Sequence, residues 1–324
     1  NHLGRIIMAQ PTNTFDTYDT VGIREDLSNV IYDVSPDETP LLSSMAKVKA
    51  TNTFHEWQTN ALRAAANNHH VEGSDTGATA VSPTERLGNY TQIFKNSVIT
   101  SGTNDVVDAA GRGNSEMSYN IIRVATEQKL DMEKALFENV ARVAGNATTA
   151  RKLAGLGAWL STNVTNIGAN GANPAGSVPG ATARTNGTQS VFNQTKFDTC
   201  MQSVWESGGK PDTVYLSAFQ MAKALGFDGN NNQRQNGAVG QVNNNIAVYL
   251  TPWGSVSFQP VRENRSRDVW IIEKDKLALA TLRPMKNEAL AKTGDNEHRQ
   301  VVCEATLVVR SQAALGLIAD CTTS

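Results

Sequence analysis

The sequence has little of what marks several common classes of protein. Its three cysteines, Cys200, Cys303 and Cys321, are odd in number and widely spaced, which predicts free thiols in a reducing compartment instead of a disulfide frame. No apolar run approaches the length of a membrane span, and residues 1–30 lack the apolar core of a secretory signal. The net charge is −2, so a nucleic-acid reader, which needs clustered Lys and Arg, is not expected.

Catalytic and metal-binding motifs are also scarce. Gly209-Lys210 lacks the earlier glycine of a Walker loop, no G-x-G-x-x-G follows a strand, and G-x-S-x-G does not occur. His55-Glu56 begins the zinc-protease motif HExxH, but Thr59 stands where the second histidine belongs. His69-His70 lies in a turn-rich segment without Cys or carboxylate spacing suited to zinc. We therefore predict no metal, no cofactor and no catalytic residues.

One pattern keeps an enzyme open as an alternative. The motifs of penicillin-recognising serine enzymes occur in the family's order, as Ser44-Met-Ala-Lys47, Ser161-Thr-Asn163 and Lys292-Thr-Gly294. In that chemistry the serine attacks and the lysine assists removal of its proton. Against this alternative, Ser44 falls inside a predicted short helix, and Lys292 runs into a loop where the family needs an edge strand.

The sequence does contain enough apolar residues for a large core, 40% of the chain against 19% charged. Residues 115–144 predict one long helix, capped by Asn114 or Ser115 and stopped at Gly145. At 1.5 Å per residue it would be about 45 Å long, which predicts an elongated or plate-like molecule. Its apolar residues follow the spacing of one buried face: Met117, Ile121, Val124, Ala125, Met132, Leu136, Val140 and Val143. Charged residues, Glu133 among them, occupy the other faces as a solvated or partner-facing surface.

A second prominent feature lies before this helix. Residues 51–62 and 87–100 have strand-like composition and flank a polar segment rich in turn residues, which predicts a long two-stranded ribbon with a loose tip. An isolated ribbon is marginal in water, and its open edges can pair with another chain. We therefore expect the ribbon to lean on a neighbouring subunit.

The other elements are short. Thr39 and Pro40 predict the start of a helix over 41–48, after another at 22–32. Residues 166–187 and 228–245 are predicted loops, the second flexible and near the centre of a ring of subunits. The later predicted elements are a helix at 195–206 around Phe197, Met201 and Trp205, a strand at 213–217, a helix at 218–227, and strands at 246–261, 268–275, 276–283, 299–311 and 314–321.

Six segments together resemble the major capsid proteins of tailed bacteriophages. They are NYTQIFKNSVITSGT (89–103), DAAGRG (108–113), LDMEKALFENVA (130–141), RKLAGLGAWLSTN (151–163), KPDTVYLSAFQMAKALGF (210–227) and CEATLVVRSQAALGLIADC (303–321). The resemblance runs in order from about residue 20 to the C-terminus and rests on the set of segments, not on one diagnostic motif.

This resemblance implies an α+β fold, the tailed-phage capsid fold of the Hong Kong ninety-seven type. It implies an N-terminal arm, an extended ribbon loop, a peripheral domain with a long spine helix, and an axial domain. On this sequence the parts would be a leader or expression remnant at 1–7, the arm at 8–50, the ribbon loop at 51–104, the peripheral domain at 105–190 with its spine helix at 114–145, the axial domain at 191–283 and C-terminal strands at 284–324.

The function implied is that of a non-enzymatic subunit that assembles with itself, as pentamers and hexamers, into an icosahedral shell around double-stranded DNA. Expected partners are a separate scaffolding protein, a portal and a decoration protein, with weak, non-specific contact to the DNA and no membrane. The shell would be a virion capsid assembled in the host bacterial cytoplasm. A non-viral protein shell of the same fold stays open as an alternative.

The ribbon supplies the candidate contacts between subunits. They are Phe54, Trp57, Tyr90, Ile93 and Phe94 along the ribbon, and Glu72, Asp75, Glu85 and Arg86 near its tip. The charged set would pair with charges on a neighbour. For the aromatic residues the equally weighted alternative is packing of the ribbon on its own subunit.

Overall fold

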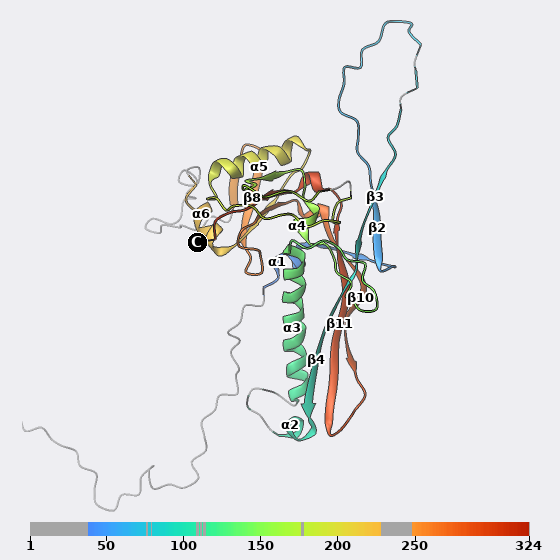
Figure 1. The fold of residues 1–324 in the computed structure, drawn as a ribbon, viewed down its shortest axis with the longest axis vertical. Helices are drawn as coiled ribbons and strands as arrows, with labels where there is room; N and C mark the ends of the chain where they lie inside the picture. The colour runs from blue at the N-terminus through green and yellow to red at the C-terminus, as the bar shows by residue number, and fades with distance from the viewer. Residues whose placement is uncertain are drawn as a thin grey trace, which may run out of the picture.

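A computed structural model describes residues 38–75, 77–78, 80–107, 110, 112, 115–175, 178–227 and 248–323. The predicted leader at 1–7, most of the arm, the helix at 22–32 and the loop at 228–245 lie outside the described residues. Figure 1 shows an elongated molecule, with one long helix beside long strands at one end, a smaller αβ body at the other, and a ribbon that extends away from both.

The long helix is present, but it is shorter than the sequence predicted. Helix α3 spans Glu116–Phe137, or about 33 Å at 1.5 Å per residue. Ser115 caps it, since the Ser115 hydroxyl oxygen accepts from the Ser118 N–H at 3.3 Å. The chain turns extended at Glu138, and the Val140 carbonyl accepts from the Gly155 N–H at 3.1 Å. A Cβ at position 155 would lie 2.1 Å from the Glu138 carbonyl oxygen, so this crossing requires glycine.

Helix α3 packs on a four-stranded sheet in the order β1 (Ala46–Lys49), β10 (Leu277–Ala289), β11 (Asn296–Val309) and β4 (Gln92–Ser101). Strand β1 is parallel to β10, and the other pairs are antiparallel. Met132 and Leu136 are buried against this sheet, as predicted. Ile121 is only half-buried, and Val140 lies beyond the end of the helix.

The αβ body contains a six-stranded sheet. Its order is β5 (Val164–Thr165), β12 (Gly316–Ile318), β9 (Val269–Ile272), β6 (Thr213–Leu216), β8 (Gly254–Pro260) and β7 (Val248–Thr251). Helices α5 (Gln194–Glu206) and α6 (Ala218–Ala224) accompany it, as predicted (Figure 1). Two details of the prediction are wrong: 246–261 is a hairpin of β7 and β8, and Trp205 is 53% exposed instead of facing the core.

Short elements join these parts. Helix α1 covers only Pro40–Ser44, because the second half of the predicted helix forms strand β1. The predicted strand at 87–100 is also two strands, β3 (Glu85–Tyr90) and β4. Strand β3 pairs with β2 (Phe54–Thr59), whereas β4 pairs with β11. The remaining short helices are α2 (Gly102–Val106), α4 (Leu156–Trp159), η2 (Lys274–Lys276) and η3 (Gln312–Ala314).

The glycine- and asparagine-rich segment predicted as a loop at 166–187 is held in place by a buried charge cluster. The Arg184 guanidinium donates to the Asp320 carboxylate, and both side chains are fully buried. Arg267 Nη2 donates to Asp320 Oδ1 at 2.6 Å, and the same carboxylate accepts from the N–H groups of Gly168 and Gly187. The Asp320 carboxylate therefore fixes the path of a segment in which Ile167 and Val178 are the only large apolar side chains.

Glu133 joins α1 to α3 and is fully buried, contrary to its predicted place on a solvated or partner-facing surface. Its carboxylate oxygens accept from the Leu41 N–H at 2.9 Å and the Leu42 N–H at 2.7 Å, the first free donors of α1. Thr39, the predicted cap, makes no side-chain capping hydrogen bond. A residue distant in the sequence therefore caps the helix, which fastens the start of the described chain to the long helix.

Removing this carboxylate should weaken the fold. Glu133→Ala leaves two backbone donors without their acceptor, and we expect it to lower the free energy of unfolding by about 1–3 kcal/mol at neutral pH in urea titrations. Glu127→Gln, which breaks an exposed pair with Arg123 on the same helix, serves as the control and should cost at most about 0.5 kcal/mol. A Glu133→Ala subunit as stable as the wild type would show that the cap is not needed.

The same carboxylate should also leave a signature in the pH dependence of stability. Burial raises the pKa of Glu133 above its usual 4.5, although the Leu42 and Leu41 N–H groups act in the opposite direction, and the charge of Glu263 raises it further. A raised pKa in the folded state means that this group's contribution to stability is present below pH 4.5 and is lost as the pH rises through the raised pKa. As the pH rises from 4.5 through the raised pKa, we therefore expect the free energy of unfolding of the wild type to fall relative to that of Glu133→Gln. A constant difference would contradict the shift.

Candidate functional site

The ribbon has two parts that differ in their contacts. Some of its side chains pack against the body of the subunit, and others are exposed. Strands β2 and β3 are antiparallel, with Phe54 opposite Tyr90 and Thr59 opposite Glu85. We call these twelve paired residues the ribbon root, and residues 60–84 the ribbon tip. The root lies against the body of the subunit, and the tip extends beyond it (Figure 1).

Trp57 fastens β2 to the body. Its indole Nε1–H donates to the Val309 carbonyl at 3.0 Å, and its ring centroid lies 5.5 Å from that of the buried Trp159. The same side chain packs against the main core and against a smaller cluster formed by Ala50, Ala278, Ala280 and Val308. Trp57 therefore makes both an aromatic and a hydrogen-bonded contact within its own subunit.

Asn89 fastens β3. Its side chain is fully buried, with Nδ2 donating to the Leu307 carbonyl at 2.9 Å and the Ala154 carbonyl at 3.2 Å. Its Oδ1 accepts from the Ala154 N–H at 2.9 Å. Because each polar atom of the amide has a backbone partner, this buried polar group is stabilising instead of costly.

A charge network holds the end of the root at Thr91. The Thr91 hydroxyl donates to Glu304 Oε1 at 2.7 Å, and Arg283 Nε donates to Oε2 of the same carboxylate at 2.9 Å. Arg151 donates both to Glu304 and, at 2.8 Å, to the Thr91 carbonyl. Thr91 is also where the predicted single strand divides, so the network fixes the bend between β3 and β4.

The tip has a different environment. Its described residues, 60–75, 77–78 and 80–84, are all exposed, including Leu62 at 91% and Val81 at 90%. A groove of about 790 Å³ separates the start of the tip from the body segment 310–313. Among these described residues, no hydrogen bond or ion pair joins the tip to the body. The hydrogen bonds that join the described ribbon to the body therefore come from the root.

The predicted contact residues fall into distinct places. Phe54 and Tyr90 pair across the root with ring centroids 4.6 Å apart, and Glu56 forms an ion pair with Arg86 at 3.2 Å. Ile93 and Phe94 do not lie on the ribbon as predicted, because both belong to β4, which pairs with β11. Phe94 is 8% exposed and belongs to the main core, whereas Ile93 is 48% exposed. The remaining candidates are exposed: Glu72 and Asp75 in the tip, and Glu85 at the outer end of the root. For Trp57 and Phe94 these positions favour the alternative of packing within the subunit.

Asn89 and Arg142 are important to the root and were not predicted from the sequence. The Arg142 guanidinium lies 5.3 Å from the Phe54 ring centroid and donates to the Gly88 carbonyl. Asn is uncommon in strands, so Asn89 inside an otherwise strand-like run was the one available signal. Nothing in the local sequence points to Arg142, because its partners lie more than fifty residues away.

The residues of the serine-enzyme alternative do not come together. Ser44 Oγ lies 2.9 Å from the Tyr215 hydroxyl, and burial raises the pKa of Tyr215 to about 12, so this phenol is not a base at neutral pH. Asn163 is buried and bonds Ser203 and the Ala313 carbonyl. Lys292 follows the far end of β10, whose last residue lies about 30 Å along the strand from the partner of Lys47.

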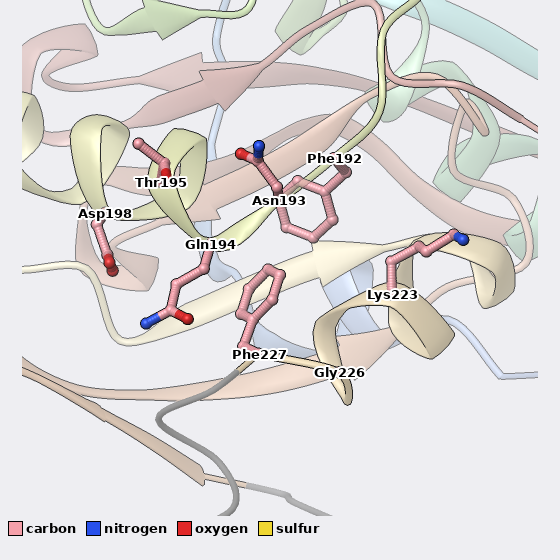
Figure 2. Close-up of a pocket in the computed structure, with 8 residues that line it drawn as sticks. All are labelled: Phe192, Asn193, Gln194, Thr195, Asp198, Lys223, Gly226 and Phe227. Atoms are coloured by element: carbon pink, nitrogen blue, oxygen red, sulfur yellow. The ribbon is translucent and has the colours of Figure 1, made fainter.

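Other possible sites are sparse in the described part of the chain. No three His, Cys, Asp or Glu side chains gather there as metal ligands would, and no described helix is both long and apolar enough to cross a membrane. The three cysteines are free and buried. Figure 2 shows a hollow beside α5 and α6 where the rings of Phe192 and Phe227 lie 5.2 Å apart, with Asp198 and Lys223 at opposite sides.

The comparison that decides the family covers nearly the whole chain. A family model described as SU10 major capsid protein matches residues 10–322. The chain belongs to the SU10 major capsid protein family. This is a family of structural proteins and not of enzymes. A curated relative, the major capsid protein of Escherichia phage Phieco32, is 38% identical over 136 residues, which cover 42% of this chain and 38% of the relative's length.

Solved structures support the fold of this SU10-family chain. The cyanophage A-1(L) capsid asymmetric unit aligns with a TM-score of 0.66 at 12% identity, over 95% of this chain and 99% of the other. The capsid of the native GTA particle aligns with a TM-score of 0.59 at 10% identity, over 94% and 98%. The major capsid and decoration proteins of phage G give a TM-score of 0.54 at 12% identity, over 97% and 100%. The predicted α+β capsid fold of the Hong Kong ninety-seven type is thereby confirmed.

Proposed function

We propose that this chain is a structural subunit that assembles with itself, as pentamers and hexamers, into an icosahedral capsid around double-stranded DNA. Membership of the SU10 major capsid protein family over residues 10–322 is the observation that carries this function. The ribbon agrees with it, because its root is built into one subunit while its described tip residues are exposed. Neither the family nor the aligned structures support the serine acyl enzyme or the non-viral shell.

The proposed mechanism is geometric. Each subunit would offer several weak contacts to its neighbours, and closure of the shell would multiply them. The tip is the first candidate, with Glu72, Asp75 and the apolar side chains Leu62, Val71 and Val81 free to meet a neighbouring subunit. Ile93 and the outer root residues Glu85 and Arg86 are further candidates. The tip would gain order only on contact, so its share of the binding energy is reduced by the cost of ordering it.

We also propose the partners of this shell. A separate scaffolding protein and a portal would direct assembly in the host bacterial cytoplasm, and the finished shell would be the virion capsid. The aligned phage G structure contains decoration proteins, which supports a decoration protein on the outside of this shell as well.

Mass photometry of the purified full-length chain, alone and co-expressed with its phage's scaffolding protein, tests this function. We expect species of five and six times the subunit mass, or closed particles. A chain that remains a monomer under both conditions would contradict the proposed function.

Contact with DNA should be weak. Because the net charge is −2, the shell has no strong excess of positive charge to hold phosphates, and packaged DNA would be confined mechanically. In filter-binding or anisotropy titrations at physiological salt, unassembled subunits should bind a duplex of arbitrary sequence no more tightly than about 10⁻⁴–10⁻⁶ M, the usual range of non-specific binding. Sub-micromolar binding that weakens steeply with added salt would instead reveal a basic surface.

A further inference from the structure

The ribbon root is held by more contacts than pairing of two short strands requires. A two-stranded ribbon is marginally stable by itself in water. Here Trp57 reaches β11 at Val309, and Asn89 reaches both β11 at Leu307 and the segment before α4 at Ala154. The two anchors stand on different strands of the ribbon and bond carbonyl groups of the same body strand, β11, two residues apart. Together they tie both strands of the root to β11.

The interior of the root is also fitted closely. A Cβ at position 88 would lie 2.6 Å from the Phe54 ring, so Gly88 lets that ring approach β3 closely. The Arg142 guanidinium lies over the same ring and donates to the Gly88 carbonyl. The inner end of the root is therefore packed against its own subunit, with Gly88 and Asn89 buried, whereas Glu85 and Arg86 at the outer end are exposed.

Burial decreases towards the outer end of the root. The groove next to segment 310–313 begins there, lined by Thr59 and Glu85 among others, and every described tip residue is exposed. Regions with few buried contacts open at low free energy, whereas well-packed regions do not. The root is therefore anchored to its subunit, whereas the tip has few contacts that would hold it in one position.

We propose that Trp57 and Asn89 are positioning residues, which fix the direction in which the ribbon leaves its subunit before that subunit meets a neighbour. The role of this direction in assembly rests on the proposed function above. The neighbour then has to order only the tip, since the root is already in place. Preorganisation of this kind strengthens association by reducing what must be ordered on contact. The direction of the root would also set the angle between adjoining subunits.

Distance measurement in dilute, unassembled full-length subunits tests the proposal. The native cysteines are buried, so spin labels can be directed to Glu85→Cys at the root's outer end and Lys129→Cys on the exposed side of α3. Double electron–electron resonance should give one narrow distance peak for this pair. A second pair, Ser74→Cys with Lys129→Cys, should give a broad distribution, because Ser74 lies in the tip.

Substitution of Trp57 then distinguishes a role in positioning the ribbon from a role in stabilising the whole fold. Trp57→Ala removes the ring and its N–H, and we expect the narrow peak to be lost while the circular dichroism of α3 is retained. Trp57→Phe keeps a ring against Trp159 but lacks the donor to Val309, and the width of its peak should lie between the two. The matched control is Trp205→Phe, an exposed tryptophan far from the ribbon in sequence, which should leave the peak unchanged.

Two results would overturn the proposal. One is a peak of unchanged position and width in Trp57→Ala or, if that variant does not fold, in Trp57→Phe. The other is an unfolded Trp57→Phe subunit, because Trp57 would then be a core residue of the fold instead of an anchor for the ribbon. A wild-type chain that never forms capsomers would overturn the proposed function alone, since the distance result is obtained on separate subunits.

In assembly reactions the same variants should behave consistently with the distances. Wild type and Trp205→Phe should form particles of uniform diameter, whereas Trp57→Ala should lose that uniformity. Uniform particles from a Trp57→Ala subunit with a broad distance distribution would show that direction at the root does not guide assembly, and would overturn that part of the proposal.

Discussion

Replacing Leu136 with Asp is expected to leave the subunit unfolded or insoluble. Leu136 is 1% exposed, in the main core between α3 and the four-stranded sheet. An aspartate there would place an uncompensated charge among apolar side chains, at a cost of about 3–5 kcal/mol. Because whole domains are stable by only about 5–15 kcal/mol, a loss of that size removes much of the margin. Solubility after expression and urea unfolding followed by circular dichroism measure the effect.

Ile122→Asp is the matched control for this change. Ile122 lies on the same helix but is 69% exposed, so the same substitution should alter the free energy of unfolding by no more than about 0.5 kcal/mol. If Leu136→Asp were soluble and as stable as Ile122→Asp, the buried face of α3 would be wrongly assigned.

Replacing Asn67–Val81 with a short Gly-Ser turn should leave the fold intact and impair assembly. The described residues of this segment are exposed and make no hydrogen bond to the body, so the isolated subunit should remain soluble with nearly unchanged thermal unfolding. The helical signal of α3 should also be unchanged. Shell formation should be blocked or much weakened, because the part of the ribbon free to reach a neighbour has been removed.

Two failures of this prediction would have different meanings. A shortened chain that closes normal, stable shells would show that the tip does not bridge subunits. A shortened chain that does not fold would place the tip in the subunit's own core, contrary to its exposure. Comparing thermal unfolding with particle yield on the same preparation separates the two.

The sequence predicted correctly those helices and strands that are determined by the spacing of their own apolar residues. Helical spacing of Met132 and Leu136 correctly gave the buried face of α3, and the apolar run at 213–217 gave the buried strand β6. The spacing failed at Val140, where apolar residues continue but the backbone is extended and bonded to Gly155. Period alone does not distinguish a helix from an extended segment packed on the same core.

Contacts between segments far apart in the chain could not be predicted from the sequence. The strand-like run at 87–100 gave no sign that it divides at Thr91, because the division depends on Glu304 and Arg151 far along the chain. Glu133 was placed on the surface for a similar reason, since its partners belong to α1. In both cases a polar side chain is buried because a distant partner satisfies it, and a single sequence does not reveal such partners.

The sequence predicted a ribbon with a polar tip, and the structure contains both, with paired strands at Phe54–Thr59 and Glu85–Tyr90. Contact of the candidate residues with a neighbouring subunit stays a prediction. The sequence did not show which of the candidate residues pack within their own subunit and which are exposed. Trp57 and Phe94 contact their own subunit, whereas Glu72 and Asp75 are exposed. This division depends on where the body ends beneath the ribbon, which is a property of the whole fold.

Electron cryomicroscopy of particles assembled from the full-length chain would show directly whether the ribbon bridges subunits of a capsid. We expect closed icosahedral shells of pentamers and hexamers, in which residues 60–84 lie on a neighbouring subunit while Trp57 remains against Trp159 of its own. Preparations that contain only single subunits or open aggregates would contradict the capsid function. Shells in which the tip folds back on its own subunit would contradict the role assigned to the ribbon.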